Sequence, residues 1–502
     1  MMKIAYFLDI AQGLGGAGNL LLQQAKLMSD LYEVIVIVPC DSQGKENEEY
    51  ARRCERYGLE YRPLEYTTAF DFCSIDMLGA VKSVKAIEEL VKKERISFFH
   101  SVQLNIAAEY VARKLHIPHI MDIYQLEEEE FVCCQGDIYP HYHLCDSKMY
   151  MKRWSRCLGV ESRCVRPVAL QEEVKRKKDY SRNEINILML GSVCARKNQL
   201  TAIKACEICM KQYSITLTIA GDMNDVYANE CVRYVKEKGL EEKVIFTGFV
   251  SDIVPLLEEN DCLLCTSCNE SFPSSMVEAL SYDLCIISTP VAGVPEVFVN
   301  EENAFVSKDF SLESIVENLD NCLRWHANES VKTIHECARY TWNENFSRQK
   351  VRKQIAEFYE DVKERPYIEK GDFDRLIRKA METKNILLNV YSDCEEMERR
   401  ALYHAKIKEK LAIGKIYLWG AGKMGGFAYK VLHTLCPELE IVAFVDKNKK
   451  GEYYGVPIIH PEELPIDKEG YYGVCFGSGR EMVIDYLQEQ GLSLNKQIWI
   501  LP

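Results

Sequence analysis

A short apolar run that leads into a glycine-containing turn and then a helical pattern occurs three times in this chain. The runs cover residues 3–10, 185–190 and 415–419. Each run begins a segment in which apolar stretches of strand length alternate with amphipathic stretches of helix length. Such alternation predicts parallel sheets covered by helices, with ligands bound where the strands end. We therefore predict an α/β protein with three doubly wound, Rossmann-like units.

The length of the chain also requires several domains, because 502 residues exceed what one hydrophobic core normally holds. Changes in composition and pattern divide the chain into five parts. We expect a Rossmann-like domain at 1–172, a second at 183–345, a helix that crosses back to the first domain at 346–366, a helical linker at 367–410 and a third, small Rossmann-like domain at 411–502.

Charge and hydropathy exclude several classes of function. The net charge of −14 argues against a surface that binds nucleic acid. The N-terminal stretch leads from a strand into a glycine turn and lacks the pattern of a cleaved signal peptide. No apolar run has the length of a membrane span. We expect a cytoplasmic protein, with at most peripheral contact at the inner face of a membrane through the basic residues at 175–178.

The stretch from Asp261 to Glu296 carries the clearest chemical pattern. An apolar run at 262–265 is followed by a polar turn and a helix start. Glu270 and Glu278 flank this helix start with seven residues between them. The N-terminus of a helix presents free N–H groups and a partial positive charge, which suits a phosphate. The two carboxylates can accept hydrogen bonds from sugar hydroxyls on either side of it.

This pattern resembles the donor site of retaining GT-B glycosyltransferases of the family-four type, the glycosyl transferases group 1. The resemblance runs nearly unbroken from 185 to 306 and implies two doubly wound domains that face a cleft. It also implies that Glu270 lies by the transferred sugar and that Glu278 binds the ribose. In the same way it implies that the diphosphate is bound by the N–H groups of Ser274, Ser275 and Met276.

Two cations near the second glycine turn are candidates for binding that diphosphate. The family has an arginine directly after the glycine and a lysine about six positions later; Lys197 fits the lysine, whereas Ser192 stands at the arginine position. Arg196 is the candidate that replaces the missing charge, since its fork of donors suits phosphate. An exposed pair of surface cations is the alternative. The glycines expected at the donor site are Gly16, Gly191 and Gly248.

The acceptor side departs from the family pattern. Gly18 stands where the family usually has a glutamate, and Tyr124 stands where it often has a histidine. His100 resembles a histidine at the end of a family strand, although a polar strand cap explains it equally well. His100 and Tyr124 are therefore the acceptor-side candidates. These departures also keep open a second interpretation, a catalytically degenerate protein that acts as a binding subunit or scaffold.

The 21 cysteines suggest reduced thiols rather than a metal site. Two motifs, Cys206-x2-Cys209 and Cys262-x2-Cys265-x2-Cys268, could be combined as zinc ligands. The first motif falls in a predicted helix, and the second falls in a strand, where Cys262 and Cys265 face opposite sides. We therefore expect no metal and interpret the cysteines as small buried side chains.

The third domain contains a Gly-x-Gly-x-x-Gly turn directly after a strand. An acidic residue ends the following strand, as in dinucleotide-binding proteins. A sugar-nucleotide binding module, a docking scaffold and an NAD-dependent enzyme remain as interpretations. The candidate nucleotide-binding residues are Gly420, Gly422, Gly425 and Asp446.

The resemblance implies a retaining, hexosyltransferase-type enzyme of bacterial polysaccharide or glycoconjugate biosynthesis. Its donor would be a nucleoside-diphosphate sugar, and its acceptor a glycan, a lipid-linked molecule or a protein. No cofactor is required for transfer, since Arg196, Lys197 and the helix N–H groups supply the positive charge that a divalent ion gives elsewhere. Glu270, Lys197 and Arg196 are the expected catalytic residues.

Overall fold

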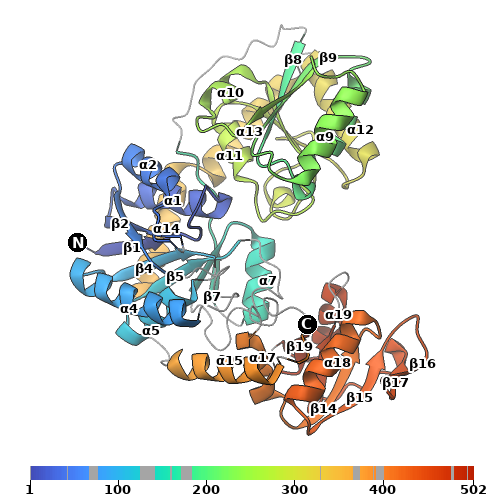
Figure 1. The fold of residues 1–502 in the computed structure, drawn as a ribbon. Helices are drawn as coiled ribbons and strands as arrows, with labels where there is room; N and C mark the ends of the chain where they lie inside the picture. Colours follow the sequence, from blue (N-terminus) through green and yellow to red (C-terminus); the bar gives the residue numbers. More distant parts are fainter. Residues whose placement is uncertain are drawn as a thin grey trace.

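The computed structural model of the chain contains three domains, each built on a parallel or mostly parallel sheet (Figure 1). The α/β prediction is thereby confirmed. We name them the N-domain (residues 2–170), the middle domain (184–345) and the third domain (373–501). The basic stretch at 175–178 lies outside the described residues. The structure describes residues 2–41, 43–66, 77–103, 105–124, 142–158, 161–170, 184–327, 330–365, 373–387, 389–391, 401–475, 480–494 and 496–501.

The N-domain is a parallel sheet with helices on both faces. Its strand order is β3-β2-β1-β4-β5-β6-β7, so the direction of winding reverses between β1 and β4, and the glycine turn after β1 lies at this switch point. The strands are β1 (Lys3–Phe7), β2 (Glu33–Pro39), β3 (Glu60–Leu64), β4 (Phe98–Val102), β5 (His119–Asp122), β6 (Tyr142–Cys145) and β7 (Glu161–Cys164). The helices are α1 (Gly16–Met28), α2 (Glu48–Tyr57), α4 (Met77–Glu94), α5 (Ile106–Leu115) and α7 (Lys148–Leu158).

The continuous apolar runs in this sequence reflect strands that are buried on both faces. In β2, Ile35 and Ile37 join the core on one side of the sheet. The alternating residues Val34, Val36 and Val38 join the core on the other side. Because both sides are covered by helices, the strands show no alternation of apolar and polar residues.

The middle domain repeats this architecture with the strand order β10-β9-β8-β11-β12-β13. Its winding also reverses, here between β8 and β11. Its strands are β8 (Glu184–Leu190), β9 (Ser214–Ala220), β10 (Val244–Gly248), β11 (Cys262–Cys265), β12 (Cys285–Ser288) and β13 (Phe305–Val306). Its helices are η1 (Ala195–Lys197), α8 (Gln199–Cys209), α9 (Val226–Glu237), α10 (Val254–Glu259), α11 (Ser274–Ser281), η2 (Val294–Glu296), α12 (Leu312–Ala327) and α13 (Val331–Asn345).

A helix after the middle domain packs back onto the N-domain. The amphipathic pattern at 342–363 suggests one helix, but the structure has two, because the chain breaks at the buried Phe346 between α13 and α14 (Arg348–Lys363). Helix α14 lies beside β1 and β4 (Figure 1) and buries the side chains of Val351, Ile355, Phe358, Tyr359 and Val362 against the N-domain core.

The third domain has a six-stranded sheet in the order β16-β17-β15-β14-β18-β19, with β16 antiparallel to β17. One buried cluster contains both Trp154 of α7 and Tyr472 of this domain, so the third domain packs against the N-domain. Among the described residues, no helix is long and apolar enough to cross a bilayer. The elements are α15 (Phe373–Leu387), α17 (Ala401–Lys410), β14 (Gly414–Trp419), α18 (Lys423–Leu435), β15 (Leu439–Val445), β16 (Gly451–Tyr453), β17 (Val456–Ile459), η3 (Pro461–Glu463), β18 (Tyr471–Val474), α19 (Arg480–Glu489) and β19 (Ile498–Ile500).

The hydroxyl of Tyr359 anchors α14, and its removal gives a first prediction. This buried hydroxyl lies 2.5 Å from the Tyr6 hydroxyl and 2.6 Å from Nδ1 of His100. Tyr359→Phe leaves both partners without it, so we expect a loss of about 1–3 kcal/mol of stability. Thermal and urea unfolding would measure the loss. Tyr340→Phe, at a site that is 70% exposed, should leave both curves unchanged; equal curves for all three proteins would contradict the anchor.

Candidate active site

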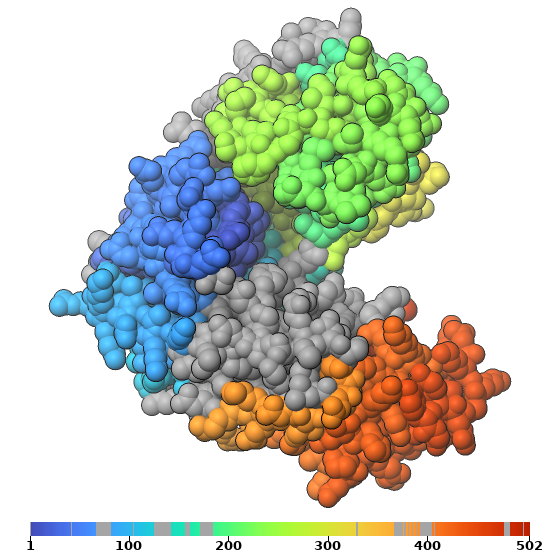
Figure 2. Space-filling view, viewed as in Figure 1, coloured from blue at the N-terminus to red at the C-terminus, as the bar shows by residue number. Residues whose placement is uncertain are grey.

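A cleft of about 1220 Å³ lies between the N-domain and the middle domain. Figure 2 shows where the N-terminal residues in blue meet the middle domain in green. The carboxyl ends of the strands next to both switch points lead into its walls. Of the predicted site residues, the cleft is lined by Gly16, Tyr124, Gly191, Arg196, Lys197, Glu270, Ser274, Ser275 and Glu278, whereas His100, Gly248 and Met276 do not line it.

Glu270 holds the two candidate cations together at the wall of the cleft. Its Oε1 lies 2.7 Å from Nζ of Lys197 and also pairs with Nη1 of Arg196. Burial alone would raise the pKa of Glu270, but Lys197 and Arg196 outweigh it and hold this pKa below its usual value. Glu270 is therefore an ionised carboxylate that places two positive charges side by side, with Arg196 still 42% exposed.

Loop-to-loop hydrogen bonds bring these three residues together, although they come from distant parts of the sequence. The Thr266 hydroxyl donates to the carbonyl oxygens of Lys197 and Asn198, both at 3.0 Å. The N–H of Cys268 donates to the carbonyl of Arg196 at 2.8 Å. These contacts fix the η1 turn after β8 against the loop after β11, and that loop carries Glu270.

Gly191 makes room for Lys197 in this arrangement. Its φ is +129°, a conformation that favours glycine, and a Cβ there would lie 3.2 Å from the Cε of Lys197. The neighbouring Gly221 is equally constrained, because a Cβ there would overlap the Gly191 carbonyl oxygen. The backbone of these two turns therefore forms a surface without side chains beside the lysine.

The N-terminus of α11 opens onto the same cleft. The N–H groups of the first residues of a helix have no partner within the helix. Ser274 and Ser275, the first two residues, line the cleft, whereas Met276 is buried and its N–H donates to the Pro273 carbonyl at 3.0 Å. Glu278 follows Ser274 by one helical turn and also lines the cleft, so both face the same side of the helix.

On the opposite wall, the structure reveals a buried carboxylate that the sequence analysis missed. Asp9 lies just after β1, is 6% exposed, and its Oδ1 has no hydrogen-bond partner within the described part of the chain. Burial raises the pKa of Asp9 from 3.8 to about 6. A polar residue at the carboxyl end of a strand beside a switch point was the available signal.

The surroundings of Asp9 also explain the glycine at position 18. A Cβ on Gly18 would lie 2.1 Å from the Tyr50 hydroxyl oxygen and 2.7 Å from Oδ1 of Asp9. No larger side chain, and certainly no glutamate, fits there without moving both groups. The Tyr50 hydroxyl therefore occupies the space that a side chain at position 18 would need. This hydroxyl accepts a hydrogen bond from the Gly15 N–H at 3.3 Å.

Tyr124 and His100 belong to one buried network. The Tyr124 hydroxyl donates to Oδ2 of Asp122 at 2.7 Å, and Nε2 of His100 lies 2.7 Å from Oδ1 of the same carboxylate. His100 is fully buried and reaches Tyr359 of α14 on its other side. Tyr124 therefore contributes to the cleft wall, while His100 positions Asp122 behind it.

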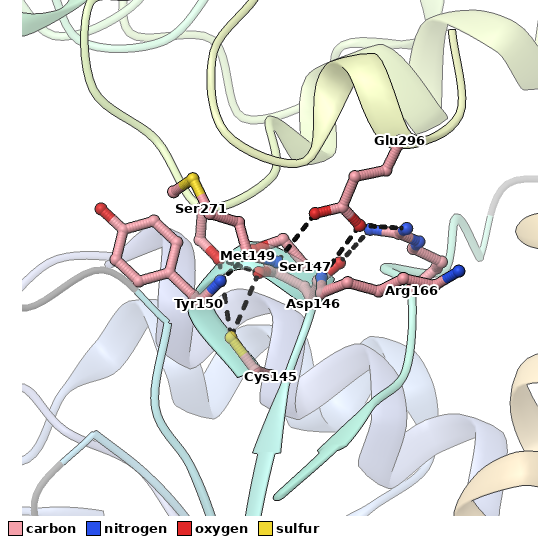
Figure 3. Close-up of polar contacts among 9 residues, drawn as sticks. Cys145, Asp146, Ser147, Met149, Tyr150, Arg166, Ser271 and Glu296 are labelled. Atoms are coloured by element: carbon pink, nitrogen blue, oxygen red, sulfur yellow. Dashed lines mark hydrogen bonds and ion pairs between the residues drawn. The ribbon is translucent and has the colours of Figure 1, made fainter. Parts of the chain in front are cut away.

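A carboxylate from the middle domain caps a helix of the N-domain and joins the two (Figure 3). The oxygens of Glu296 accept hydrogen bonds from the N–H groups of Lys148 and Met149 at the start of α7, at 2.9 and 2.8 Å. Oε2 of Glu296 also lies 2.6 Å from Nη2 of Arg166. The partial positive charge of the α7 N-terminus and the guanidinium both favour the ionised glutamate.

A second contact between the domains lies next to Glu270. The hydroxyl of Ser271 donates to Oδ1 of Asp146 and lies 3.2 Å from the Ser147 hydroxyl oxygen (Figure 3). Burial raises the pKa of Asp146 to about 7, although the Ser271 hydrogen bond opposes this. The loop that carries Glu270 is thus attached to the end of β6 in the N-domain.

In the third domain, the candidate acidic residue bonds its own turn. Asp446 accepts hydrogen bonds from the N–H groups of Ala421, Asn448 and Lys449 at 3.0, 2.9 and 3.2 Å. Burial would raise the pKa of Asp446, but these three N–H groups and the charge of Lys449 lower it. Gly425 is required here, because a Cβ would overlap the Gly420 carbonyl oxygen. Gly422 begins α18 as its N-cap.

The raised pKa of Asp9 predicts a difference between the wild type and Asp9→Asn that depends on pH. Between about pH 4 and pH 6 the folded wild type keeps its proton while the unfolded chain loses it, so wild-type stability falls by about 3 kcal/mol across this window. Asp9→Asn lacks this loss. Its Tm should exceed that of the wild type by about 6–12 °C at pH 7 and by much less at pH 4.

The exposed Glu55 on α2 of the same domain provides the matched control, and Glu55→Gln should follow the wild type at every pH. Differential scanning fluorimetry from pH 4 to pH 8 would measure all three proteins. A constant Tm difference between Asp9→Asn and the wild type across this range would contradict the assignment.

Comparisons with known proteins give a family match for part of the chain and a fold for most of it. Residues 171–339 match the family model of glycosyl transferases group 1. Similar curated proteins include N-acetyl-alpha-D-glucosaminyl L-malate synthase of Bacillus anthracis, 23% identical over 47% of this chain and 57% of the relative. The GPI3 subunit of phosphatidylinositol N-acetylglucosaminyltransferase of Saccharomyces cerevisiae is 24% identical over 40% of this chain and 44% of the relative. The matches thus span about half the length of these relatives.

Similar solved structures cover 72% of the chain. A glycosyltransferase from Rickettsia africae has a TM-score of 0.60 with 17% identity, over 99% of its own length. HepE of Anabaena, in complex with UDP and glucose, has a TM-score of 0.59 with 16% identity, over its full length. These likenesses show the fold. Residues 171–339 therefore resemble the glycosyl transferases group 1, in a chain whose fold is the GT-B fold of these solved glycosyltransferases.

Proposed function

We propose that this protein transfers a sugar from a nucleoside-diphosphate sugar to an acceptor in bacterial polysaccharide or glycoconjugate biosynthesis. One observation carries the proposal. The Glu270 carboxylate, the cations of Arg196 and Lys197, and the N-terminus of α11 lie together on the wall of a cleft between two domains. This combination of charge and free N–H groups suits a diphosphate that is attached to a sugar.

The donor would bind against the middle domain. The Glu270 carboxylate lies between both cations, so an incoming diphosphate would share them with it. The N–H groups of Ser274 and Ser275 would bind the phosphate oxygens, and Glu278 would accept hydrogen bonds from the ribose hydroxyls. The binding of UDP by HepE, a protein of the same fold, is consistent with this arrangement.

We further propose transfer with retention of the anomeric configuration. The bond between the anomeric carbon and the phosphate oxygen breaks, and a bond from the acceptor oxygen forms on the same face. The acceptor proton passes to the leaving phosphate oxygen. Lys197, Arg196 and the N–H groups stabilise the charge that develops on the diphosphate, which is the role of a divalent ion in other transferases.

The acceptor would bind against the N-domain wall. Asp9 is the group suited to an acceptor hydroxyl, because its buried Oδ1 has no other partner among the described residues. Tyr124 lies on the same wall and is positioned through Asp122. Contact between the two domains at Ser271 and Asp146 would keep water from the reacting centre.

A sugar-nucleotide binding module, a docking scaffold and an NAD-dependent enzyme are the candidate functions of the third domain. Its Gly420, Gly422 and Gly425 turn precedes a helix, as in nucleotide-binding domains. Because both oxygens of Asp446 accept backbone N–H groups, we favour a role of this residue in shaping the turn. We also propose a cytoplasmic location, since no disulfide joins the cysteines in the part of the chain that the structure describes.

A catalytically degenerate GT-B scaffold is the second candidate. Ser192 at the family's arginine position favours it, because one cation is absent there. Arg196 counters this, since its guanidinium already pairs with Glu270 at the cleft wall. The departure at Gly18 carries little weight, because Asp9 and Tyr50 fill the space of the missing side chain.

A donor-turnover experiment tests this function. The purified protein is incubated with UDP-, GDP-, ADP- and dTDP-sugars, with and without brief EDTA treatment, and release of the nucleoside diphosphate is followed. We expect release from one donor that survives EDTA. Glu270→Ala and Lys197→Ala should each lower it about 100-fold or more. The first removes the carboxylate that holds both cations in position, and the second removes one of these cations.

Glu258→Ala is the matched control, since Glu258 is exposed on the same domain and does not line the cleft. Its release rate should equal that of the wild type. Absence of both release and thermal shift with every donor would contradict transfer and favour the scaffold.

A further inference from the structure

Three cysteines and a histidine meet in the core of the middle domain, away from the cleft. Cys262 on β11 and Cys285 on β12 stand directly opposite each other on paired parallel strands. Cys322 and His326 are four residues apart on α12, so both lie on the helix face that packs against the sheet. Cys262, Cys322 and His326 thus bring three potential ligand atoms within 4.8 Å of one another, and Cys285 lies beside them.

Three distances between ligand atoms in this cluster are close to the edges of a tetrahedral zinc site. The Sγ of Cys322 lies 4.0 Å from the Sγ of Cys262 and 3.9 Å from the Sγ of Cys285. Nε2 of His326 lies 3.4 Å from the Sγ of Cys262. Zinc bonds of about 2.3 Å to sulfur and about 2.0–2.1 Å to nitrogen give tetrahedral edges of about 3.8 Å between sulfurs and about 3.6 Å from sulfur to nitrogen.

Burial of the cluster fits a structural metal site. The three cysteines are at most 1% exposed and His326 is 7% exposed. Cys285, whose side chain has to turn toward the ion, would be the fourth protein ligand and would leave no open coordination position. Soft sulfur with one imidazole is the donor set of structural zinc. Because cysteine binds zinc as the thiolate, the protons of the three thiols leave when the ion enters.

We propose that the middle domain binds one Zn²⁺ through Cys262, Cys285, Cys322 and His326. The ion links α12 to β11 and β12 through its ligands. β11 leads directly into the loop that carries Glu270, and β12 leads into the loop that carries Glu296. The ion therefore stabilises the strands that support the donor side, and it takes no part in the transfer itself.

This site differs from the cysteine combination that the sequence suggests. Of the spaced motifs, only Cys262 belongs to the cluster, whereas Cys206 lies on α8 and Cys265 points to another part of the core. The remaining ligands come from Cys285, Cys322 and His326, which form no compact motif together with Cys262.

Metal analysis of the full-length protein tests the proposal without reference to activity. The protein is purified under reducing conditions from cells supplied with zinc, and its metal content is measured by inductively coupled plasma mass spectrometry. We expect about one zinc per chain, as for a closed structural site. A metal-free wild type that also takes up no zinc on refolding in its presence would overturn the proposal, as would iron in place of zinc.

Matched variants locate the ion. Cys322→Ser and His326→Gln should each lose most of the bound zinc and unfold at a lower temperature. Cys206→Ser removes an equally buried thiol from the same core and should keep the zinc. Retention of one zinc by both ligand variants, or its loss from Cys206→Ser as well, would contradict the assignment. If the ligand variants fail to fold, the wild-type content and the thiolate-to-metal absorption of the Co²⁺-substituted protein decide the question.

Discussion

The architecture of the cleft depends on one carboxylate that crosses between domains. Glu296 comes from the middle domain, caps the N-terminus of α7 in the N-domain and pairs with Arg166. The adjoining Gly293 permits this approach, since a Cβ there would lie 2.8 Å from the Cβ of Ser147. The Glu296 side chain is 18% exposed and accepts hydrogen bonds from two N–H groups and from Arg166. Because each hydrogen bond has a direction, this carboxylate fixes the distance between the two cleft walls better than an apolar contact would.

Beyond this contact, the cleft is built from loops that follow parallel strands. Its charged and N–H groups come from several of these loops, which meet at one wall. The turn after β8 contributes two cations, the loop after β11 contributes Glu270, and α11 contributes its free N–H groups. The Thr266 and Cys268 hydrogen bonds hold the first two together. Both cations are paired with Glu270 in this geometry, so binding of an anionic donor exchanges one partner for another and avoids leaving a charge without a partner.

The sequence predicted the sheets well, because strand-length apolar runs and glycine turns are local signals. It also located Glu270, Lys197 and Glu278, which the cleft contains. It missed Asp9, since a single carboxylate at a strand end gives no motif and its burial follows only from the folded structure. It could not place His100 behind the wall, because its partners Asp122 and Tyr359 are distant in sequence. The sequence analysis did not group Cys285, Cys322 and His326 with Cys262 for the same reason, since only the folded domain brings them together.

The most direct test of the account is a crystal structure of the protein soaked with the nucleoside diphosphate that binds it most tightly. We expect the diphosphate to lie against Arg196, Lys197 and the N–H groups of Ser274 and Ser275, with the ribose at Glu278. Density for the nucleotide at the glycine turn of the third domain, with the cleft unchanged and Glu270 still between both cations, would contradict it.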